Sequence, residues 1–465
     1  MSRQHTSSKY QSQSGKTKKR IAAHLEKINL FAAGIDIGSR SHFVAIPEEL
    51  DDQPIREFNC FTGDLEAMAD WLVRCGINTV VMESTGVYWI PAFEILESRG
   101  LEVKLVNARH VKNVPGRKSD VLDCQWLQHL HTFGLLRGAF RPDDQMCALR
   151  SFMRQRDNLV RYRASHIQHT QKALRQMNLL LDNVVTDITG QTGMTIIRAI
   201  LSGEHDPQVL ASYRDKRCKK SENEIAKSLK GNYRPEHLFA LRQSVELYDT
   251  YDEKINACDV ALEQQLNKFD SAGSPPGSPD SGSSAKRKSR SAPGFDVRSE
   301  LYRVAGVDLT KIDGIDEKTA LKIVSETGLD MSRWSSVKKF TAWLGLCPGT
   351  HISGGKVLKR ATKRIPSAAA CALRMAAFGL MNSRSALGAY CRRMRSRLGA
   401  PKAITATAHK LARLYYSMLK HGSDYVDKGQ DYYEREYKNR VMKNLKNKAS
   451  ELGFTLVPVE PTMTG

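Results

Sequence analysis

The spacing of hydrophobic residues changes several times along the chain, and each change predicts a different kind of element. Short apolar runs and alternating segments predict β-strands in the first part of the chain, at residues 31–38, 41–47, 55–61, 78–83 and 102–107. Residues 65–75 and 87–100 have helical spacing instead, and the second of these segments ends at Gly100. The first hundred residues therefore predict a mixed α/β domain.

The order of these segments predicts how the strands pair. The first three strands follow one another closely, which favours an antiparallel meander, whereas the last three alternate with helices, which favours parallel pairing through crossovers. A meander followed by alternating helices and strands is the order of an RNase H-like fold. We assign this α/β domain to residues 29–142, after a basic, polar segment at residues 1–28 that is expected to be disordered.

Helical periodicity dominates the next part of the chain. Residues 143–182 and 235–269 form two long amphipathic stretches, separated by a polar section punctuated by glycines. This pattern predicts a helical arm at residues 143–270, built as a coiled coil or helical hairpin. An ordinary helical bundle packed on the first domain fits the same periodicity equally well.

A segment rich in Ser, Pro and Gly separates the arm from the last domain. Residues 271–294 cannot bury a core and are interpreted as a flexible linker. Beyond it, residues 295–453 predict a mostly α-helical C-terminal domain, followed by a tail at 454–465. Within this domain, residues 309–328 resemble a helix-hairpin-helix that faces DNA phosphate, and a plain helical turn is the alternative.

Charge sharpens the picture. The 465-residue chain has 71 Lys and Arg against 50 Asp and Glu, a net charge of +21, which favours a polyanionic partner. From His351 to Lys420 there is no Asp or Glu at all. Because solvated surfaces normally mix both signs, this stretch indicates a nucleic-acid-binding face.

Cysteine usage and hydropathy exclude other classes of protein. The nine cysteines are scattered and none forms a C-x-x-C pair, which fits a reducing cytoplasm and argues against a zinc module. No uncharged apolar run approaches the ~18 residues that a membrane span needs, and the basic N-terminal segment has no apolar core of a signal peptide. We therefore expect a cytoplasmic protein that works without a membrane.

Four carboxylates stand out by their placement: Asp36, Glu83, Asp120 and Asp123. Asp36 and Glu83 end two buried strands, while Asp120 and Asp123 lie on one face at the start of a helix. Converging carboxylates repel one another unless a cation offsets their charge, and Mg²⁺, with Mn²⁺ as a substitute, is the natural match. Each residue also has a plainer interpretation, as a turn residue, an ion-pair partner or a helix-start residue.

Four motifs give the chain a resemblance to a known family. They are GIDIGS, ESTGVYW, VNARHVKNVPGRKSDVLDCQWL and FTAWLGLCPGTHISGGKVLKRATKRI. The chain resembles the DEDD transposases of bacterial and archaeal insertion sequences, which include bridge-RNA-guided recombinases. The resemblance implies a RuvC-like nuclease domain with the tetrad on Asp36, Glu83, Asp120 and Asp123. It also implies a C-terminal transposase domain with a nucleophilic serine, Ser353.

The residues around Ser353 are compatible with that role. Two glycines follow it and allow close approach to a phosphate, and a set of cations comes next. The expected nucleic-acid-binding residues are Lys356, Lys359, Arg360, Lys363, Arg364, Arg392, Arg393, Arg395 and Arg397. Taken alone, Ser-Gly-Gly-Lys is also what an ordinary glycine turn looks like. The chain departs from the family pattern at Pro366, where a glycine-containing segment is usual.

The sequence thus predicts a DNA recombinase that cuts and rejoins strands with Mg²⁺ and a serine nucleophile. By resemblance it works as a homo-oligomer, a tetramer of paired dimers, on DNA that a non-coding bridge RNA specifies. Three alternatives remain open at this stage. They are a site-specific DNA invertase without an RNA guide, a metal-dependent structure-specific endonuclease, and a non-catalytic nucleic-acid-binding protein.

Overall fold

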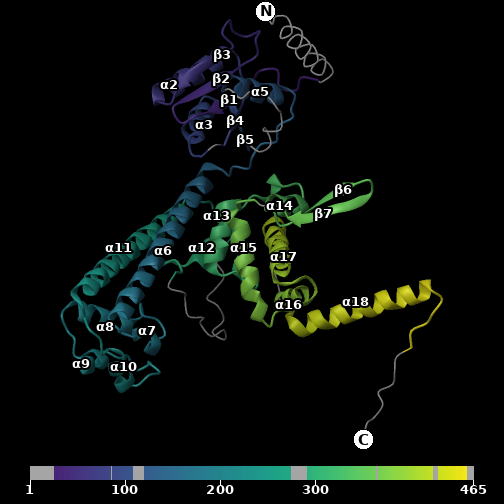
Figure 1. Ribbon diagram of the computed structural model, residues 1–465. Coiled ribbons are helices and arrows are strands. Elements are labelled where there is room, and N and C mark those ends of the chain that lie inside the picture. Colours follow the sequence, from purple (N-terminus) through teal and green to yellow (C-terminus); the bar gives the residue numbers. More distant parts are fainter. Residues whose placement is uncertain are drawn as a thin grey trace, which may run out of the picture. The chain divides into compact units, whose positions relative to one another are not determined.

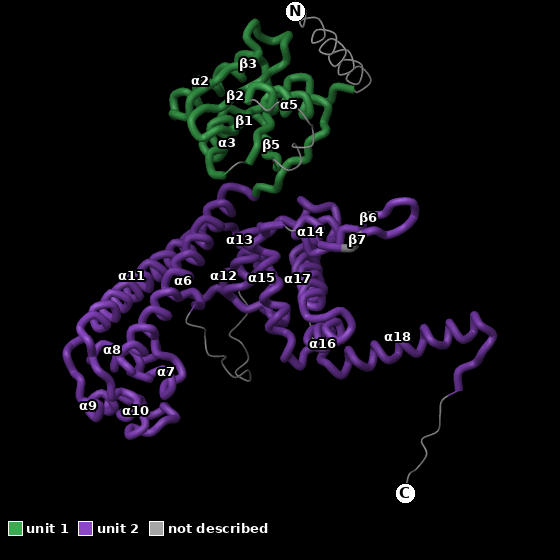
Figure 2. The backbone as a smooth tube through the Cα atoms, viewed as in Figure 1, with its two compact units in different colours: residues 1–141 green, residues 142–465 purple. Residues whose placement is uncertain are grey.

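The computed structural model describes residues 26–84, 86–107, 120–273, 291–362, 365–422 and 428–457. The chain divides into two compact units, residues 1–141 and residues 142–465 (Figure 2). Residues 1–25 of the predicted N-terminal segment, residues 274–290 of the predicted linker and residues 458–465 of the predicted tail lie outside the described residues.

Unit 1 is built on a five-stranded mixed sheet (Figure 1). Its strands are β1 (Ala32–Ile37), β2 (Ser41–Ala45), β3 (Ile55–Asn59), β4 (Thr79–Glu83) and β5 (Glu102–Val106). Their order in the sheet is β3-β2-β1-β4-β5, with β1, β2 and β3 antiparallel and β1, β4 and β5 parallel. This RNase H-like order confirms the predicted fold.

Three helices cover the two faces of this sheet: α2 (Thr62–Arg74), α3 (Trp89–Ser98) and α5 (Asp120–Thr132). Val80 and Met82 of β4 belong to the core that α2 and α3 close, whereas Val81, between them, packs with Leu127 of α5. Side chains alternate between the faces of a strand, so β4 is buried on both sides. This explains its unbroken apolar sequence.

Unit 2 begins with two long helices that pack along each other, α6 (Asp144–Gln176) and α11 (Pro235–Leu266) (Figure 1). The side chain of Asp143 starts α6 by accepting a hydrogen bond from the Met146 N–H at 2.8 Å. Between the long helices lie four short ones, α7 (Leu181–Val184), α8 (Gln191–Leu201), α9 (Pro207–Ser212) and α10 (Glu222–Ser228). The short helices and the adjoining ends of α6 and α11 share a hydrophobic core, and we call this region the arm tip.

A buried ion pair joins the two long helices of the arm. Arg156 of α6 is fully buried and donates two hydrogen bonds to the carboxylate of Asp259 on α11. The same two side chains also bind the backbone of residues 291–294. Arg156 donates to the Ser291 carbonyl at 3.0 Å, and the Gly294 N–H donates to Asp259 Oδ2 at 3.0 Å. The coiled-coil geometry of this helix pair stays a prediction.

The rest of unit 2 is mostly helical, as predicted. Its elements are α12 (Val297–Ala305), η1 (Leu309–Lys311), α13 (Glu317–Thr327), η2 (Met331–Arg333), α14 (Val337–Trp343), β6 (Pro348–Ser353), β7 (Lys356–Thr362), α15 (Ala368–Gly379), η3 (Leu380–Asn382), α16 (Ala386–Leu398), α17 (Ala400–His421) and α18 (Gly429–Glu451). Tyr415 of α17 is fully buried, stacks near Phe340 of α14 and shares a hydrogen bond with the Thr327 hydroxyl.

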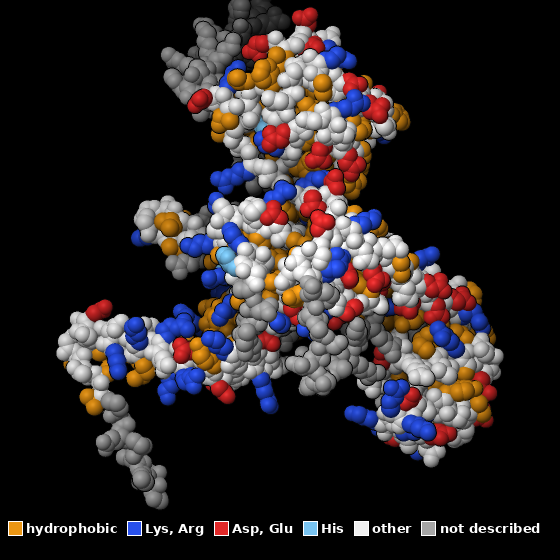
Figure 3. Space-filling model, turned by 180° about the vertical axis from the view of Figure 1, so that it is seen from behind, with side chains coloured by type: hydrophobic (Ala, Val, Ile, Leu, Met, Phe, Trp, Pro, Cys, Tyr) orange, Lys and Arg blue, Asp and Glu red, His pale blue; other side chains and the backbone are white. Residues whose placement is uncertain are grey.

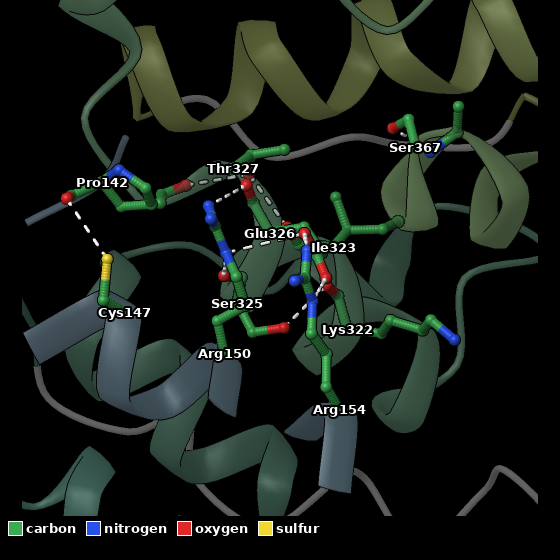
Figure 4. Close-up of polar contacts among 12 residues, drawn as sticks. Pro142, Cys147, Arg150, Arg154, Lys322, Ile323, Ser325, Glu326, Thr327 and Ser367 are labelled. Atoms are coloured by element: carbon green, nitrogen blue, oxygen red, sulfur yellow. Dashed lines mark hydrogen bonds and ion pairs between the residues drawn. The ribbon is translucent and has the colours of Figure 1, made fainter. Parts of the chain in front are cut away.

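Two arginines tie the arm to these helices by capping helix ends. Arg303 of α12 donates to the Leu266 and Phe269 carbonyls at the end of α11. Arg150 of α6 donates to the Ser325 and Glu326 carbonyls at the end of α13 (Figure 4). Positive charge at a helix C-terminus satisfies carbonyls that have no partner inside the helix. Arm and helices therefore form a single compact unit.

The segment predicted as a helix-hairpin-helix has a shorter first arm than expected. The three-residue η1 and the helix α13 flank Gly314, whose φ is +84°. A Cβ at Gly314 would lie 3.0 Å from the Ala376 carbonyl of α15, so this turn packs closely against α15 and η3. No helix in the described part of the chain is long and apolar enough to cross a membrane.

Candidate active-site residues

Asp36 and Glu83 lie at the carboxyl ends of two neighbouring strands. β1 and β4 are parallel, and Ile35 pairs with Met82, so the following residues, Asp36 and Glu83, are the next pair in register. Ile35 and Met82 face the core closed by α2 and α3. Because strand side chains alternate, Asp36 and Glu83 face the other side, which α5 covers. Both residues are half-buried.

The other two carboxylates lie in the first turn of α5, with Asp120 exposed and Asp123 half-buried. The backbone of α5 comes unusually close to β1. A Cβ on Gly34 would stand 2.3 Å from the Gln128 nitrogen and 2.5 Å from the Cys124 oxygen. Glycine at position 34 thus lets the helix lie directly on the strand that carries Asp36.

Cys124 reports on the electrostatics between the helix and the strand. Burial, the largest cause, and the negative charges of Asp36 and Asp123 together raise the pKa of its thiol to about 12. The Cys124 thiol is therefore within electrostatic range of two carboxylates, Asp36 on β1 and Asp123 on α5. At such a pKa the thiol is protonated at neutral pH.

The oxygen atoms of these carboxylates are the kind of ligand that a hard divalent cation binds. They come from three elements of one domain, and Mg²⁺ prefers oxygen ligands of this kind. Within the described residues, no three His, Cys, Asp or Glu side chains stand close enough together to hold an ion. Asp36 and Glu83 make contacts of their own in the present arrangement. Residues 108–119, which precede α5 and include Lys118 of the family motif, lie outside the described residues.

Ser353 ends β6 at the turn of a two-stranded hairpin (Figure 1). It pairs with Lys356, and both residues between them have positive φ, +53° at Gly354 and +74° at Gly355. Two consecutive positive φ angles make a tight hairpin turn, and glycine adopts both of them without strain. Ser353 and Lys356 are exposed, and a Cβ on either glycine would meet no atom within 4 Å. The hydroxyl therefore has open space around it.

The predicted cations fall into three groups. Lys356 is exposed beside the hairpin turn, and Lys359 and Arg360 follow on β7, whereas Lys363 and Arg364 lie outside the described residues. Arg395 and Arg397 are exposed in the last turn of α16.

The third group, Arg392 and Arg393, has partners inside the protein. Arg392 donates to the Ser383 carbonyl at 2.5 Å and to Gln430 Oε1 at 2.7 Å. The guanidinium of Arg393 lies 3.4 Å from the ring centroid of Tyr437. These contacts attach α18 to α16, so both arginines have a structural task whether or not they also meet a phosphate.

One cationic element was not singled out from the sequence. No residue of α18 is buried among those described, and Lys and Arg side chains are spread along it (Figure 3). They are Arg435, Lys438, Arg440, Lys443, Lys446 and Lys448. The acidic residues of α18 are confined to its beginning and its last residue, and residues 437–450 contain no Asp or Glu. The even distribution of polar residues around the helix is the signal that would have found it.

Three histidines, His131, His166 and His169, have ordinary packing partners. Buried His131 shares a hydrogen bond with the Thr79 hydroxyl at 2.9 Å, and burial lowers its pKa to about 4. His166 lies between His169 and Tyr251, stacked on the tyrosine ring at 5.3 Å between centroids. Their rings are engaged in packing within unit 1 and in the arm.

Comparison with known protein families gives two matches, one over unit 1 and the start of unit 2, the other within unit 2. A model described as a DEDD transposase of the IS110 type matches residues 33–179. A second model, described as transposase of the IS116/IS110/IS902 family, matches residues 306–392. The first match spans the sheet, α5 and α6, and the second spans α13 to α16 with the Ser353 hairpin. No curated protein matches the chain.

Proposed function

Because the chain belongs to the IS110 family of transposases, we propose that it cuts and rejoins the DNA of an insertion sequence with two sets of residues, one in each unit. The enzyme class, a DNA strand-transfer enzyme, comes with the family. The residue roles are our proposal. The observation that carries it is that Asp36 and Glu83 each directly follow the Ile35–Met82 register pair, on the face that α5 covers.

In this proposal Asp36, Glu83, Asp120 and Asp123 hold Mg²⁺. The metal, when bound, supplies positive charge for the oxygens of the phosphate under attack. The protein's own contribution is placement. Gly34 sets the closeness of α5 to β1, and the strand register sets Asp36 beside Glu83. DEDD transposases generally depend on a divalent metal, which is consistent with this use of the carboxylates.

Ser353 is the proposed nucleophile. Its Oγ attacks a DNA phosphorus, the bond from phosphorus to one deoxyribose oxygen breaks, and that oxygen leaves as a hydroxyl after taking a proton. A hydroxyl from the second DNA end then attacks the phosphoserine, forms the new phosphodiester and releases Ser353. The exposed hairpin turn and the neighbouring Lys356 favour this role, because a phosphate can approach without a steric barrier and meets a cation.

The proposal extends to partners. We expect a bridge RNA to specify donor and target DNA by base pairing, and a tetramer in which the carboxylates of one copy serve Ser353 of another. The RuvC-like domain at 29–142, the arm at 143–270 and the serine domain at 295–453 are the proposed working parts. DNA binding follows from the transposase family itself.

The decisive experiment traps the covalent intermediate. Protein, the ends of its own element, the RNA transcribed beside it and Mg²⁺ are mixed and denatured, and peptides carrying DNA are identified by mass. We expect the adduct on Ser353, and its loss in Ser353→Ala and in Mg²⁺-free buffer. The matched control is Thr350→Ala, which removes a hydroxyl from the same strand and should retain the adduct.

The same experiment separates the alternatives. An adduct that forms equally well after RNase treatment supports a DNA invertase without an RNA guide. DNA cleavage at an unchanged rate in Ser353→Ala supports a metal-dependent endonuclease and overturns the serine assignment. Unchanged cleavage in Asp36→Asn would overturn the carboxylate assignment.

A further inference from the structure

The arm tip contains an open pocket. The residues that line it are distant in sequence from the proposed reaction residues. The pocket has a volume of about 630 Å³, and Asn178, His205, Lys230 and Asn232 around it are exposed. The lining comes from the end of α6, the connection between α8 and α9, and the connection between α10 and α11. The lining residues that carry the argument are Asn178, His205, Lys230, Gly231, Asn232 and Tyr233.

Backbone hydrogen bonds hold the two connections in place. The Asn232 N–H donates to the Met177 carbonyl at 3.1 Å, and the Leu180 N–H donates to the Ser228 carbonyl at 2.8 Å. The chains approach so closely at Gly231 that a Cβ there would lie 2.2 Å from the Met177 oxygen. These hydrogen bonds hold the two connecting segments side by side, with Asn178 on one segment and Asn232 on the other.

Two lining residues have left-handed backbone conformations, Asn178 with φ of +57° and Tyr233 with φ of +43°. They are the only non-glycine residues with positive φ in the described chain. Asparagine adopts this conformation readily, but it is uncommon for a bulky aromatic residue. Such conformations persist where the surrounding structure enforces them, and they cluster at ligand-binding sites.

Tyr233 supports an aromatic platform. Its ring stacks on the His205 ring, with centroids 4.2 Å apart and an interplanar angle of 19°. The Tyr233 hydroxyl donates to the Leu229 carbonyl at 2.7 Å, and this hydrogen bond fixes the orientation of the tyrosine ring. Burial raises the pKa of Tyr233 to about 12, helped by the charge of Glu204, so the ring stays uncharged at neutral pH. His205 is exposed and lies against this fixed partner.

The combination of groups selects a class of ligand. Aromatic rings stack on nucleobases, primary amides form paired hydrogen bonds with base edges, and an ammonium group binds phosphate. His205, Asn178, Asn232 and Lys230 all line this one open pocket. We propose that the arm-tip pocket binds one unpaired nucleotide of a single-stranded nucleic acid. This goes beyond the proposed strand-transfer reaction and involves none of its residues.

Binding of labelled oligonucleotides to the full-length chain tests the proposal. The probes are unstructured 12-nucleotide single strands of RNA and of DNA, each as adenine and as pyrimidine homopolymers, together with a DNA duplex of equal length. Stacking on one aromatic residue contributes about 1–3 kcal/mol, so His205→Ala should weaken single-strand binding roughly 5- to 150-fold. Asn232→Ala should weaken it as well, and duplex binding should change less than twofold.

Tyr213→Ala is the matched control, because it removes an exposed aromatic ring from the same arm tip outside the pocket. It should bind every probe as the unmodified chain does. Loss with RNA alone, with DNA alone or with both identifies which strand occupies the pocket, and each of these supports the proposal. It is overturned if His205→Ala and Asn232→Ala bind single strands within twofold of the unmodified chain, or lose single-strand and duplex binding equally.

The readout is independent of the strand-transfer proposal. The Ser353 adduct can fail to form while the arm tip still binds single strands, and the reverse can also occur. Photo-crosslinking gives a second measurement that does not depend on a variant. A single strand carrying a photoreactive pyrimidine should label peptides that contain His205 or Tyr233, and labelling confined to other parts of the chain would contradict the site.

Discussion

At the scale of single residues, Gly34 has the tightest structural requirement near the proposed carboxylate site. The backbone of α5 occupies the space where any other residue would carry a Cβ. Glycine in a buried strand ordinarily weakens it, so its presence in β1 needs a local cause. That cause is the close approach of α5, the helix that carries two of the four carboxylates.

We predict that Gly34→Ala destabilises the chain by about 1–3 kcal/mol, because the added methyl group must push α5 away from β1. Strand transfer should fall more than stability explains, since Asp123 moves with the helix. Gly63→Ala is the control, because a Cβ there meets no atom within 4 Å and lies on α2. The measurements are urea unfolding and strand transfer at a temperature where both variants are folded. Equal behaviour of the two variants would contradict the packing argument.

The sequence predicted where the candidate carboxylates lie on their strands, but it did not predict the hydrogen-bond partners of the candidate cations. The strand-end positions of Asp36 and Glu83 followed from the apolar runs that precede them. The pairing of Arg392 with Ser383 and Gln430 did not, because a cation in a basic stretch has the same sequence signature whether it meets a phosphate or a carbonyl. Only the packing of α18 against α16 distinguishes the two.

At the scale of elements, strands and long helices were predicted well and short or exposed elements were not. The predicted strand at 78–83 is β4 at Thr79–Glu83, and the predicted helical stretch at 235–269 is α11 at Pro235–Leu266. Burial on both faces or over many turns leaves a strong periodic signal. The β6–β7 hairpin leaves none, since Ile352 is 64% exposed and Leu358 is 70% exposed. The arm-tip helices α7, α9 and α10 have only four, six and seven residues, too few for a helical period to show.

The two arm helices support a prediction about their buried ion pair. Arg156→Met should destabilise the arm by about 3–5 kcal/mol, because Asp259 is left buried without its cation. Adding Asp259→Leu should recover most of that loss. Arg198→Met, which breaks the exposed pair with Asp249, should cost less than about 1 kcal/mol. Urea unfolding followed by hydrogen exchange in α6 and α11 measures all three, and equal losses for Arg156→Met and Arg198→Met would contradict the prediction.

At the scale of the whole molecule, the proposed reaction residues are divided between the two units. The carboxylates lie in unit 1 and Ser353 in unit 2. Sequence reasoning could assign them to separate domains because each occurs in its own motif. It could not foresee that the arm shares a compact unit with the C-terminal helices, because that joining depends on Arg150, Arg303 and Glu326 contacting carbonyls and charges distant in sequence.

The anchoring of residues 272 and 291–294 has a practical consequence for residues 274–290. The Ala272 N–H donates to the Arg303 carbonyl, and Ser291 and Gly294 are held by the Arg156–Asp259 pair, so both flanks belong to the same compact unit. The length between them therefore does not set the spacing of α11 and α12. Doubling a loop costs only about 0.6 kcal/mol in closure entropy.

We therefore predict that a peptide tag inserted between Ser281 and Gly282 leaves the unfolding of the arm and strand transfer unchanged within twofold. The same tag inserted after Tyr251, inside α11, should abolish both. Equal damage from the two insertions would show that the spacing at 274–290 matters after all. If the first insertion is tolerated, this position offers an attachment point for a fluorophore or an affinity handle, through which assembly on nucleic acid can be followed without touching either set of reaction residues.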